Sequence, residues 1–123
     1  CLVTMGSWSK RDTLFFSSDN SSSSISAEGD ITIEVDSIDH VLEQVDGKVD
    51  FIKMDVEGVE YDAIEGAKET LKNKKPVLNI ALYHRSEDIF ELPLKISEIN
   101  PEYKFYIRKH PYIPCWDMNL YCI

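Results

Sequence analysis

Three acidic side chains stand close together in the middle of the chain, at Asp55, Glu57 and Glu60. Asp55 lies within an apolar stretch, Val49–Val56, whose composition is typical of a β-strand. Because side chains alternate along a strand, Asp55 and Glu57 should point to the same side. Gly58 lets the backbone turn sharply after them. Carboxylates in such a place could bind a substrate or take its proton.

The same side chains have a purely structural alternative. A helix should begin near Glu60, and acidic groups stabilise a helix N-terminus by about 0.3–1 kcal/mol each. Glu60 could serve only that purpose, whereas Asp55 on an otherwise apolar strand fits it less well. We therefore predict Asp55 as a catalytic residue, and Glu57 and Glu60 as substrate-binding residues.

A histidine follows the next apolar stretch. Val77–Tyr83 is almost continuously apolar, as expected for a strand buried on both faces, and His84 comes directly after it. If the two strands are neighbours, His84 stands beside Asp55, where a neutral imidazole next to a carboxylate can act as general base for a hydroxyl. The alternative is a histidine that caps the next helix or fixes a loop. Lys53 should share the face of Asp55, where it could pair with a carboxylate or hold an acidic substrate.

Further positive charge stands near the C-terminus, in the segment Arg108–Tyr112 (RKHPY). Its cationic and aromatic groups could frame a polar substrate, so Arg108 is predicted as a substrate-binding residue; a solvated loop is the alternative. Asp55, Glu57 and His84 are also plausible metal ligands, but their spacing does not require an ion, so no metal site is predicted. The sequence contains no glycine-rich motif of the kind that holds a nucleotide or a cofactor tail.

The elements that would position these residues form a strand–helix–strand unit. Val49–Val56 and Val77–Tyr83 are the strands, and Val59–Asn73 between them carries apolar residues on one helical stripe. Such a unit has a right-handed crossover and two parallel strands. In an open α/β sheet, ligands bind beyond the carboxyl ends of the strands, which is where Asp55 and His84 stand.

Strands and short helices are predicted on both sides of this unit. The upstream elements are strands at Thr13–Phe16 and Ile31–Val35, and a short helix from Ile38 to Val45 capped by Asp36 or Ser37. Between the two strands, the serine-rich segment Ser17–Gly29 is interpreted as a flexible loop or as a mobile flap over a site. The downstream elements are a helix opened by Ser86–Asp88 and kinked or divided by Pro93, and an antiparallel hairpin of Tyr103–Arg108 and Met118–Ile123 joined by Lys109–Asp117.

Charge and composition restrict the possible partners. The 123 residues carry a net charge of −9 and are 43% hydrophobic, which is ordinary for a soluble folded domain. A negative field repels nucleic-acid phosphates and anionic lipid, and no apolar run approaches the ~18 residues that span a bilayer, so neither nucleic acid nor a membrane is a predicted partner. Cys1, Cys115 and Cys122 form no C-x-x-C pair and are interpreted as free thiols of a reducing, cytoplasmic compartment. Because the chain opens on Cys1 rather than Met, we interpret it as a piece of a longer protein.

Several blocks of the chain together match a known pattern. They are Phe51–Glu60 (FIKMDVEGVE), Gly66–Leu71 (GAKETL), Lys75-Pro76, Leu82–His84 (LYH), Leu92-Pro93 and Tyr103–Arg108, with Val35–Asp39 (VDSID) upstream. In kind and order these blocks resemble the FkbM family of S-adenosylmethionine-dependent methyltransferases, and the resemblance covers nearly the whole chain.

This resemblance implies a Rossmann-like class I methyltransferase fold, an α/β fold of which the chain would hold the later half of the sheet. Residues 1–123 would be the C-terminal part of a single methyltransferase domain, without its N-terminal cofactor-binding strands. The implied reaction moves a methyl group from S-adenosylmethionine to a hydroxyl of a sugar or a similar small metabolite. Asp55 or His84 would remove the proton, while Lys53 and Glu57 would orient the acceptor. The fragment alone is expected to be inactive, since most cofactor-binding residues would precede Cys1.

Two other classes of protein stay open. A non-catalytic α/β module could bind proteins or carbohydrates, and the exposed edge of a free half-sheet would favour homo-oligomers. A metal-dependent hydrolase could use Asp55, Glu57 and His84 as ligands.

Overall fold

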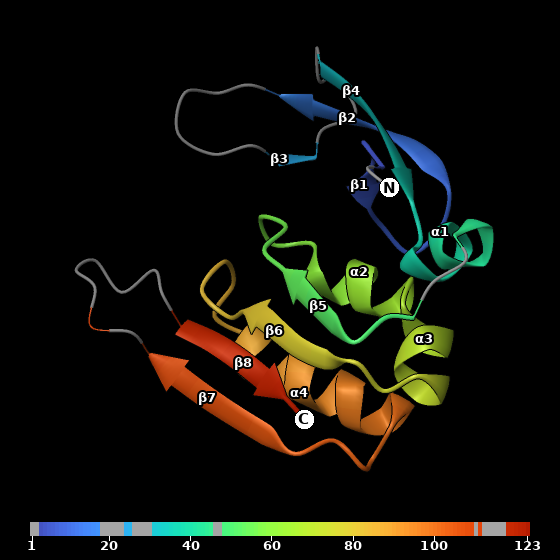
Figure 1. Cartoon of the computed structure of the whole chain (residues 1–123). Helices are drawn as coiled ribbons and strands as arrows, with labels where there is room; N and C mark the ends of the chain where they lie inside the picture. Colours follow the sequence, from blue (N-terminus) through green and yellow to red (C-terminus); the bar gives the residue numbers. More distant parts are fainter. Residues whose placement is uncertain (1–2, 18–23, 26–30, 46–47, 110, 112–117) are drawn as a thin grey trace.

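The structure, a computed structural model, describes residues 3–17, 24–25, 31–45, 48–109, 111 and 118–123 (Figure 1). Its strands are β1 (Gly6–Ser7), β2 (Asp12–Ser17), β3 (Ser24–Ile25), β4 (Ile31–Asp36), β5 (Phe51–Met54), β6 (Val77–Ala81), β7 (Phe105–Lys109) and β8 (Met118–Cys122). Its helices are α1 (Ile38–Gln44), α2 (Glu60–Glu65), α3 (Lys68–Asn73) and α4 (Asp88–Ile99). Most of the predicted flap Ser17–Gly29 and of the predicted loop Lys109–Asp117 lies outside the described residues.

A four-stranded sheet in the order β5-β6-β8-β7, called the C-terminal sheet below, holds the second half of the chain. β5 pairs in parallel with β6, so that Phe51 stands beside Val77 and Met54 beside Ile80. β8 is antiparallel to both β6 and β7. The predicted parallel pair of strands and the predicted hairpin are thus confirmed. The second strand of the hairpin lies next to β6, in keeping with the complete burial of Leu120 in β8 and the exposure of most of β7.

The first third of the chain forms a sheet of its own, in the order β1-β4-β2-β3 (Figure 1). β4 is parallel to β1 and antiparallel to β2. The predicted strands at Thr13–Phe16 and Ile31–Val35 are confirmed, although nothing in their pattern indicates a separate sheet. α1 follows β4 and is capped as predicted, because the Oγ of Ser37 accepts a hydrogen bond from the backbone N–H of His40 at 3.2 Å.

The prediction of a single helix over Val59–Asn73 is wrong, because two short helices, α2 and α3, meet at Gly66. The carbonyl oxygen of Trp8 packs directly on this glycine, and a Cβ placed there would lie only 2.0 Å from it. No other residue type allows the N-terminal segment to approach so closely. The helix break therefore marks the place where the two sheets of the molecule are joined.

A distant carboxylate caps the second of these helices. Asp39 in α1 accepts hydrogen bonds from the backbone N–H groups of Glu69 at 2.8 Å and Thr70 at 2.9 Å. The backbone N–H of Asp39 in turn donates to the carbonyl of Gly66 at 2.9 Å. The first amides of a helix have no partner within the helix, so a carboxylate at this position satisfies them and also opposes the helix dipole. Asp39 thus anchors α1 to the corner between α2 and α3.

α4 runs from Asp88 to Ile99 and is not divided at Pro93, contrary to one of the two outcomes predicted there. Proline lacks an N–H group and so removes one helix hydrogen bond. Leu92 and Ile96 on either side of it are fully buried and hold both halves of the helix against the sheet. None of the helices among the described residues is long and apolar enough to cross a lipid bilayer.

Helices α2, α3 and α4 lie on one face of the C-terminal sheet (Figure 1). The core between them consists of Met54, Leu78, Ile80, Leu120 and Cys122 from the strands and Ala63, Ile64, Leu71, Leu92 and Ile96 from the helices.

The opposite face of this sheet, called the uncovered face below, carries Phe51, Lys53, Val77, Asn79, Tyr106, Tyr121 and Ile123. Phe51 is 56% exposed, Tyr106 50% and Ile123 57%. No helix of the described residues packs against these side chains, whereas parallel strands in α/β proteins normally bury both faces.

Candidate active site

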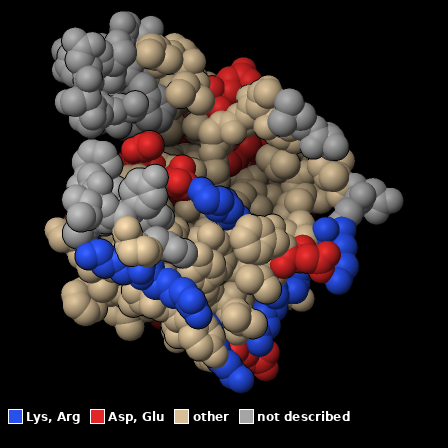
Figure 2. All heavy atoms as spheres, turned by 60° about the vertical axis from the view of Figure 1, so that its left-hand side comes forward, with Lys and Arg blue, Asp and Glu red and all other residues tan. Residues whose placement is uncertain are grey.

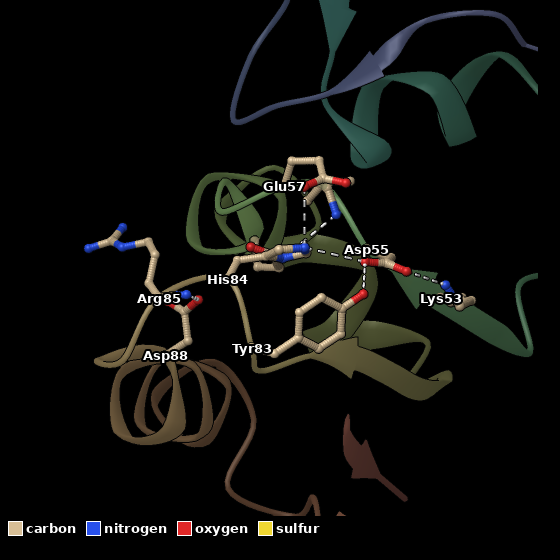
Figure 3. Close-up of polar contacts among 9 residues, drawn as sticks. Lys53, Asp55, Glu57, Tyr83, His84, Arg85 and Asp88 are labelled. Carbon is tan, nitrogen blue, oxygen red and sulfur yellow. Dashed lines mark hydrogen bonds and ion pairs between the residues drawn. The ribbon is translucent and has the colours of Figure 1, made fainter. Parts of the chain in front are cut away.

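The carboxyl ends of β5 and β6 lie side by side because the two strands are parallel neighbours. Asp55 directly follows β5, and His84 stands in the segment after β6 (Figure 3). The Nε2 atom of His84 is 3.6 Å from Oδ1 of Asp55 and 3.5 Å from Oε2 of Glu57. The structure thus brings together Asp55, Glu57 and His84, three of the predicted site residues.

Two hydrogen bonds hold the carboxylate of Asp55. The Tyr83 hydroxyl donates to Oδ1 at 2.7 Å, and the Lys53 ammonium donates to Oδ2 at 3.0 Å. Partial burial opposes the charge on this carboxylate, but the hydrogen bonds from Tyr83 and Lys53 outweigh it and keep the pKa of Asp55 below its ordinary value of 3.8. Asp55 is therefore a fixed negative charge at neutral pH and a weak proton acceptor.

A tight turn after Asp55 returns the chain over the imidazole of His84. Glu57 and Gly58 both have positive φ values, 55° and 90°. Positive φ suits glycine but is uncommon for glutamate. The side chain of Glu57 is 72% exposed, so it lies on the solvent side of His84. Backbone conformations of this kind are concentrated at functional sites.

Glu60 lies on the opposite, buried side of the same imidazole. It is completely buried, and its Oε1 atom is 2.6 Å from Nδ1 of His84. The same oxygen accepts a hydrogen bond from the backbone N–H of Val56 at 3.1 Å. Glu60 was predicted as a substrate-binding residue, but its carboxylate faces Val56 and His84 and does not line the surface that a substrate reaches. It braces the turn and the histidine instead.

Arg108 is the predicted site residue that the structure does not bring to His84. It lies on β7, which β6 and β8 separate from β5. With Tyr106, Tyr121 and Ile123 it lines a hollow of about 450 Å³ on the uncovered face.

On the side of the molecule turned forward in Figure 2, acidic side chains gather around a recess in the upper half and basic side chains lie mainly below.

Two residues that contribute here were not singled out from the sequence. Tyr83 completes the apolar run of its strand, and its position directly before His84 was the available signal. Asp88 opens α4 and accepts a hydrogen bond from the backbone N–H of Arg85 at 3.1 Å, which fixes the turn that carries His84. Burial and the nearby charge of Glu60 raise the pKa of Asp88 above its ordinary value of 3.8.

Histidine and carboxylate side chains of this kind are common metal ligands. Among the residues that the structure describes, no group of three or more His, Cys, Asp or Glu side chains is arranged to hold a metal ion.

Parallel strands with polar side chains at their carboxyl ends define an α/β protein of the kind that binds small ligands at this edge. Comparison with known proteins narrows the class. Residues 4–110 match the methyltransferase FkbM domain, and the chain therefore belongs to this methyltransferase family. The crystal structure of the methyltransferase FkbM from Methylobacillus flagellatus KT, at 2.20 Å resolution, matches with a TM-score of 0.77 and 30% sequence identity. No match was found among curated proteins.

That match covers 100% of this chain but only 28% of the Methylobacillus chain. The α/β architecture, with its parallel and antiparallel strands, therefore agrees with a partial Rossmann-like fold.

S-adenosylmethionine is the cofactor that this family implies, and the residues present fit one end of it. Asp55 and Glu57 offer negative charge at the strand ends, which suits a positively charged sulfonium. The sequence offers no glycine-rich turn for the rest of the cofactor.

Proposed function

We propose that this chain forms the acceptor side of an S-adenosylmethionine-dependent O-methyltransferase that acts on a hydroxyl of a sugar or a similar small metabolite. One observation carries the proposal. In a chain of the methyltransferase family, Nε2 of His84 lies between Asp55 and Glu57 at the ends of two parallel strands. Open α/β sheets bind their ligands at this edge.

His84 is proposed as the general base. When bound, S-adenosylmethionine supplies an electrophilic methyl group on a sulfonium. Forming the new O–CH₃ bond as the S–CH₃ bond breaks releases the hydroxyl proton, and Nε2 of His84 takes it. Asp55 serves this step less well, because its hydrogen bonds hold its pKa low. The imidazolium that forms lies close to the negative charges of Asp55 and Glu57, which stabilise it.

Asp55 and Glu57 are also proposed to orient the acceptor. Carboxylate oxygens accept hydrogen bonds, and a sugar presents neighbouring hydroxyls that can donate them. The side chain of Glu57 is 72% exposed and that of Asp55 37%, so both are open to a ligand. Lys53 keeps Asp55 in place through its ion pair at 3.0 Å.

We also propose that the chain is the C-terminal part of a larger methyltransferase domain. The uncovered face supports this, because it exposes Phe51, Tyr106 and Ile123 on a sheet of a kind that normally has two helical layers. The remaining part of the domain would cover this face and hold the adenosyl part of the cofactor. The chain alone should then bind S-adenosylmethionine weakly or not at all.

The test is methyl transfer by the full-length protein from S-adenosylmethionine to a panel of sugars and other hydroxyl compounds. His84→Gln and Asp55→Asn should each lower turnover by about 10²-fold or more. Calorimetry should show nearly unchanged affinity of the His84→Gln variant for the cofactor. His40 provides a matched control, because it lies on α1 and pairs with Asp36 at 2.8 Å, so His40→Gln should retain wild-type turnover. Full turnover in both site variants would refute the assignment.

A second function is favoured by the uncovered face and by the outer edge of β5. Among the described strands, β5 pairs with β6 alone, so this edge is open to another strand. A non-catalytic module would use these surfaces for homo-oligomers or for carbohydrates. Light scattering of the isolated chain, together with glycan binding that Asp55→Asn leaves unchanged, would indicate this function, because the acceptor site proposed for the enzyme lies at Asp55 and Glu57.

A further inference from the structure

The imidazole of His84 is held differently at its two nitrogen atoms. On the buried side, Nδ1 lies 2.6 Å from Oε1 of Glu60, a hydrogen-bond distance. On the open side, the nearest carboxylate oxygens that face Nε2 belong to Asp55 and Glu57, at 3.6 Å and 3.5 Å. These distances are too long for good hydrogen bonds. One nitrogen is therefore fixed and the other is left for a ligand.

The fixed nitrogen has a defined role because Oε1 of Glu60 is itself oriented. The backbone N–H of Val56 can only donate, and it points to this same oxygen at 3.1 Å. Oε1 therefore acts as an acceptor, and Nδ1 of His84 is the donor to it. With the proton on Nδ1, a neutral imidazole leaves Nε2 with a free lone pair.

We propose that Glu60 is a positioning residue that sets the tautomer of His84, so that the unprotonated Nε2 faces the acceptor. The use of this nitrogen as a base rests on the function proposed above, whereas the tautomer itself does not. Glu60 touches neither the acceptor nor the methyl group, because it is completely buried. Its proposed effect on proton transfer passes through the ring of His84, and its hydrogen bond from Val56 separately holds the turn.

A second carboxylate–histidine pair in the same chain shows what is particular to His84. Nδ1 of His40 lies 2.8 Å from Oδ2 of Asp36. Its Nε2 atom, however, is 3.1 Å from Nε2 of Gln44, within hydrogen-bond distance. Both ring nitrogens of His40 are thus occupied within the chain. His40 is an internal reference for a histidine with the same kind of carboxylate partner and no free nitrogen.

Nitrogen-15 NMR of histidine-labelled full-length protein, at a pH where imidazole is neutral, tests the proposal directly. The wild-type spectrum should show His84 with its proton on Nδ1. Glu60→Gln should keep this tautomer, because the amide oxygen can still accept from Val56 and His84. Glu60→Leu removes the acceptor, and Nε2 should then carry the proton and donate to Asp55 or Glu57. The signals of His40 should stay unchanged in both variants.

Turnover gives the second measurement. Glu60→Leu should lower kcat by about 10²-fold with little change in KM, and Glu60→Gln should restore most of the rate. A wild-type His84 with its proton on Nε2, or a Glu60→Leu protein with the wild-type tautomer, would overturn the proposal. If Glu60→Leu does not fold, the wild-type and Glu60→Gln spectra decide. If NMR shows the expected tautomers but the full-length protein transfers a methyl group to no acceptor, the proposed function is refuted. The role of Glu60 in setting the tautomer of His84 would still hold.

Discussion

The cap on α3 offers a sharp test of how the two sheets are joined. Asp39 lies on α1, yet its two carboxylate oxygens accept hydrogen bonds from the backbone N–H groups of Glu69 and Thr70, about 30 residues later in the chain. Asp39→Ala removes both acceptors and leaves two helix amides without a partner. It also removes the negative charge from the positive end of the helix dipole.

The expected loss follows from these contacts. Removing an N-cap side chain costs about 0.5–2 kcal/mol, and a hydrogen bond to a charged group contributes about 1.5–3 kcal/mol. One of the two hydrogen bonds here is exposed and the other is only partly buried, so each bond is expected to contribute no more than the lower end of the second range. The two contributions are then added. We expect the free energy of unfolding to fall by about 2–3 kcal/mol. In a domain of this size the melting temperature should drop by roughly 10 °C.

Urea and thermal unfolding followed by circular dichroism measure this loss. Glu43→Ala is the matched control, since Glu43 is an exposed acidic residue on the same helix. It should change the free energy of unfolding by less than about 0.5 kcal/mol. A loss for Asp39→Ala no larger than that of the control would refute the view that this carboxylate anchors α1 to α3.

Three further predictions concern other parts of the molecule. Gly66→Ala should destabilise the protein in thermal unfolding, because the added methyl would meet the carbonyl of Trp8 at 2.0 Å. Asp88→Asn should leave the free energy of unfolding at pH 7 equal to or higher than that of the wild type, and the difference between the two proteins should vanish near pH 3. The raised pKa of Asp88 means that the wild-type folded state loses stability as the pH rises from below 3.8. Asparagine can still accept the hydrogen bond from the backbone N–H of Arg85. Cys122 should resist iodoacetamide at pH 8 until the protein unfolds, as measured by mass spectrometry, because burial raises the pKa of its thiol to about 12.

The meeting of Asp55, Glu57 and His84 was predictable from local patterns. The apolar stretches Val49–Val56 and Val77–Tyr83 located β5 and β6, although both strands end two residues earlier than predicted. The strand–helix–strand connection required the two strands to be parallel. Parallel neighbours end at the same edge of a sheet, so the residues that follow them must meet. No knowledge of distant contacts was needed for this part of the site.

The role of Glu60 and the position of Arg108 depend on information that no local pattern contains. Glu60 contacts His84 across 24 residues of sequence, and the turn before Glu60 takes positive φ at Glu57, a residue type in which positive φ is uncommon. Arg108 lies away from the site because β8 inserts between β6 and β7, and a hairpin pattern does not say which of its strands joins the sheet. The close contact of Gly66 with the carbonyl of Trp8 likewise joins residues that are far apart in the sequence.

Lys53 connects the uncovered face with the chemistry proposed at its edge. In register it stands beside Asn79, and its ammonium pairs with Asp55 at 3.0 Å. The side chain of Lys53 is 56% exposed and that of Asp55 37%, so water weakens this ion pair in the chain as it stands. A second layer packed on the uncovered face would displace that water and strengthen the attraction. The same layer would also desolvate the carboxylate of Asp55, which opposes its charge, so the hydrogen bonds from Tyr83 and Lys53 remain the interactions that keep Asp55 ionised beside the proposed base, His84.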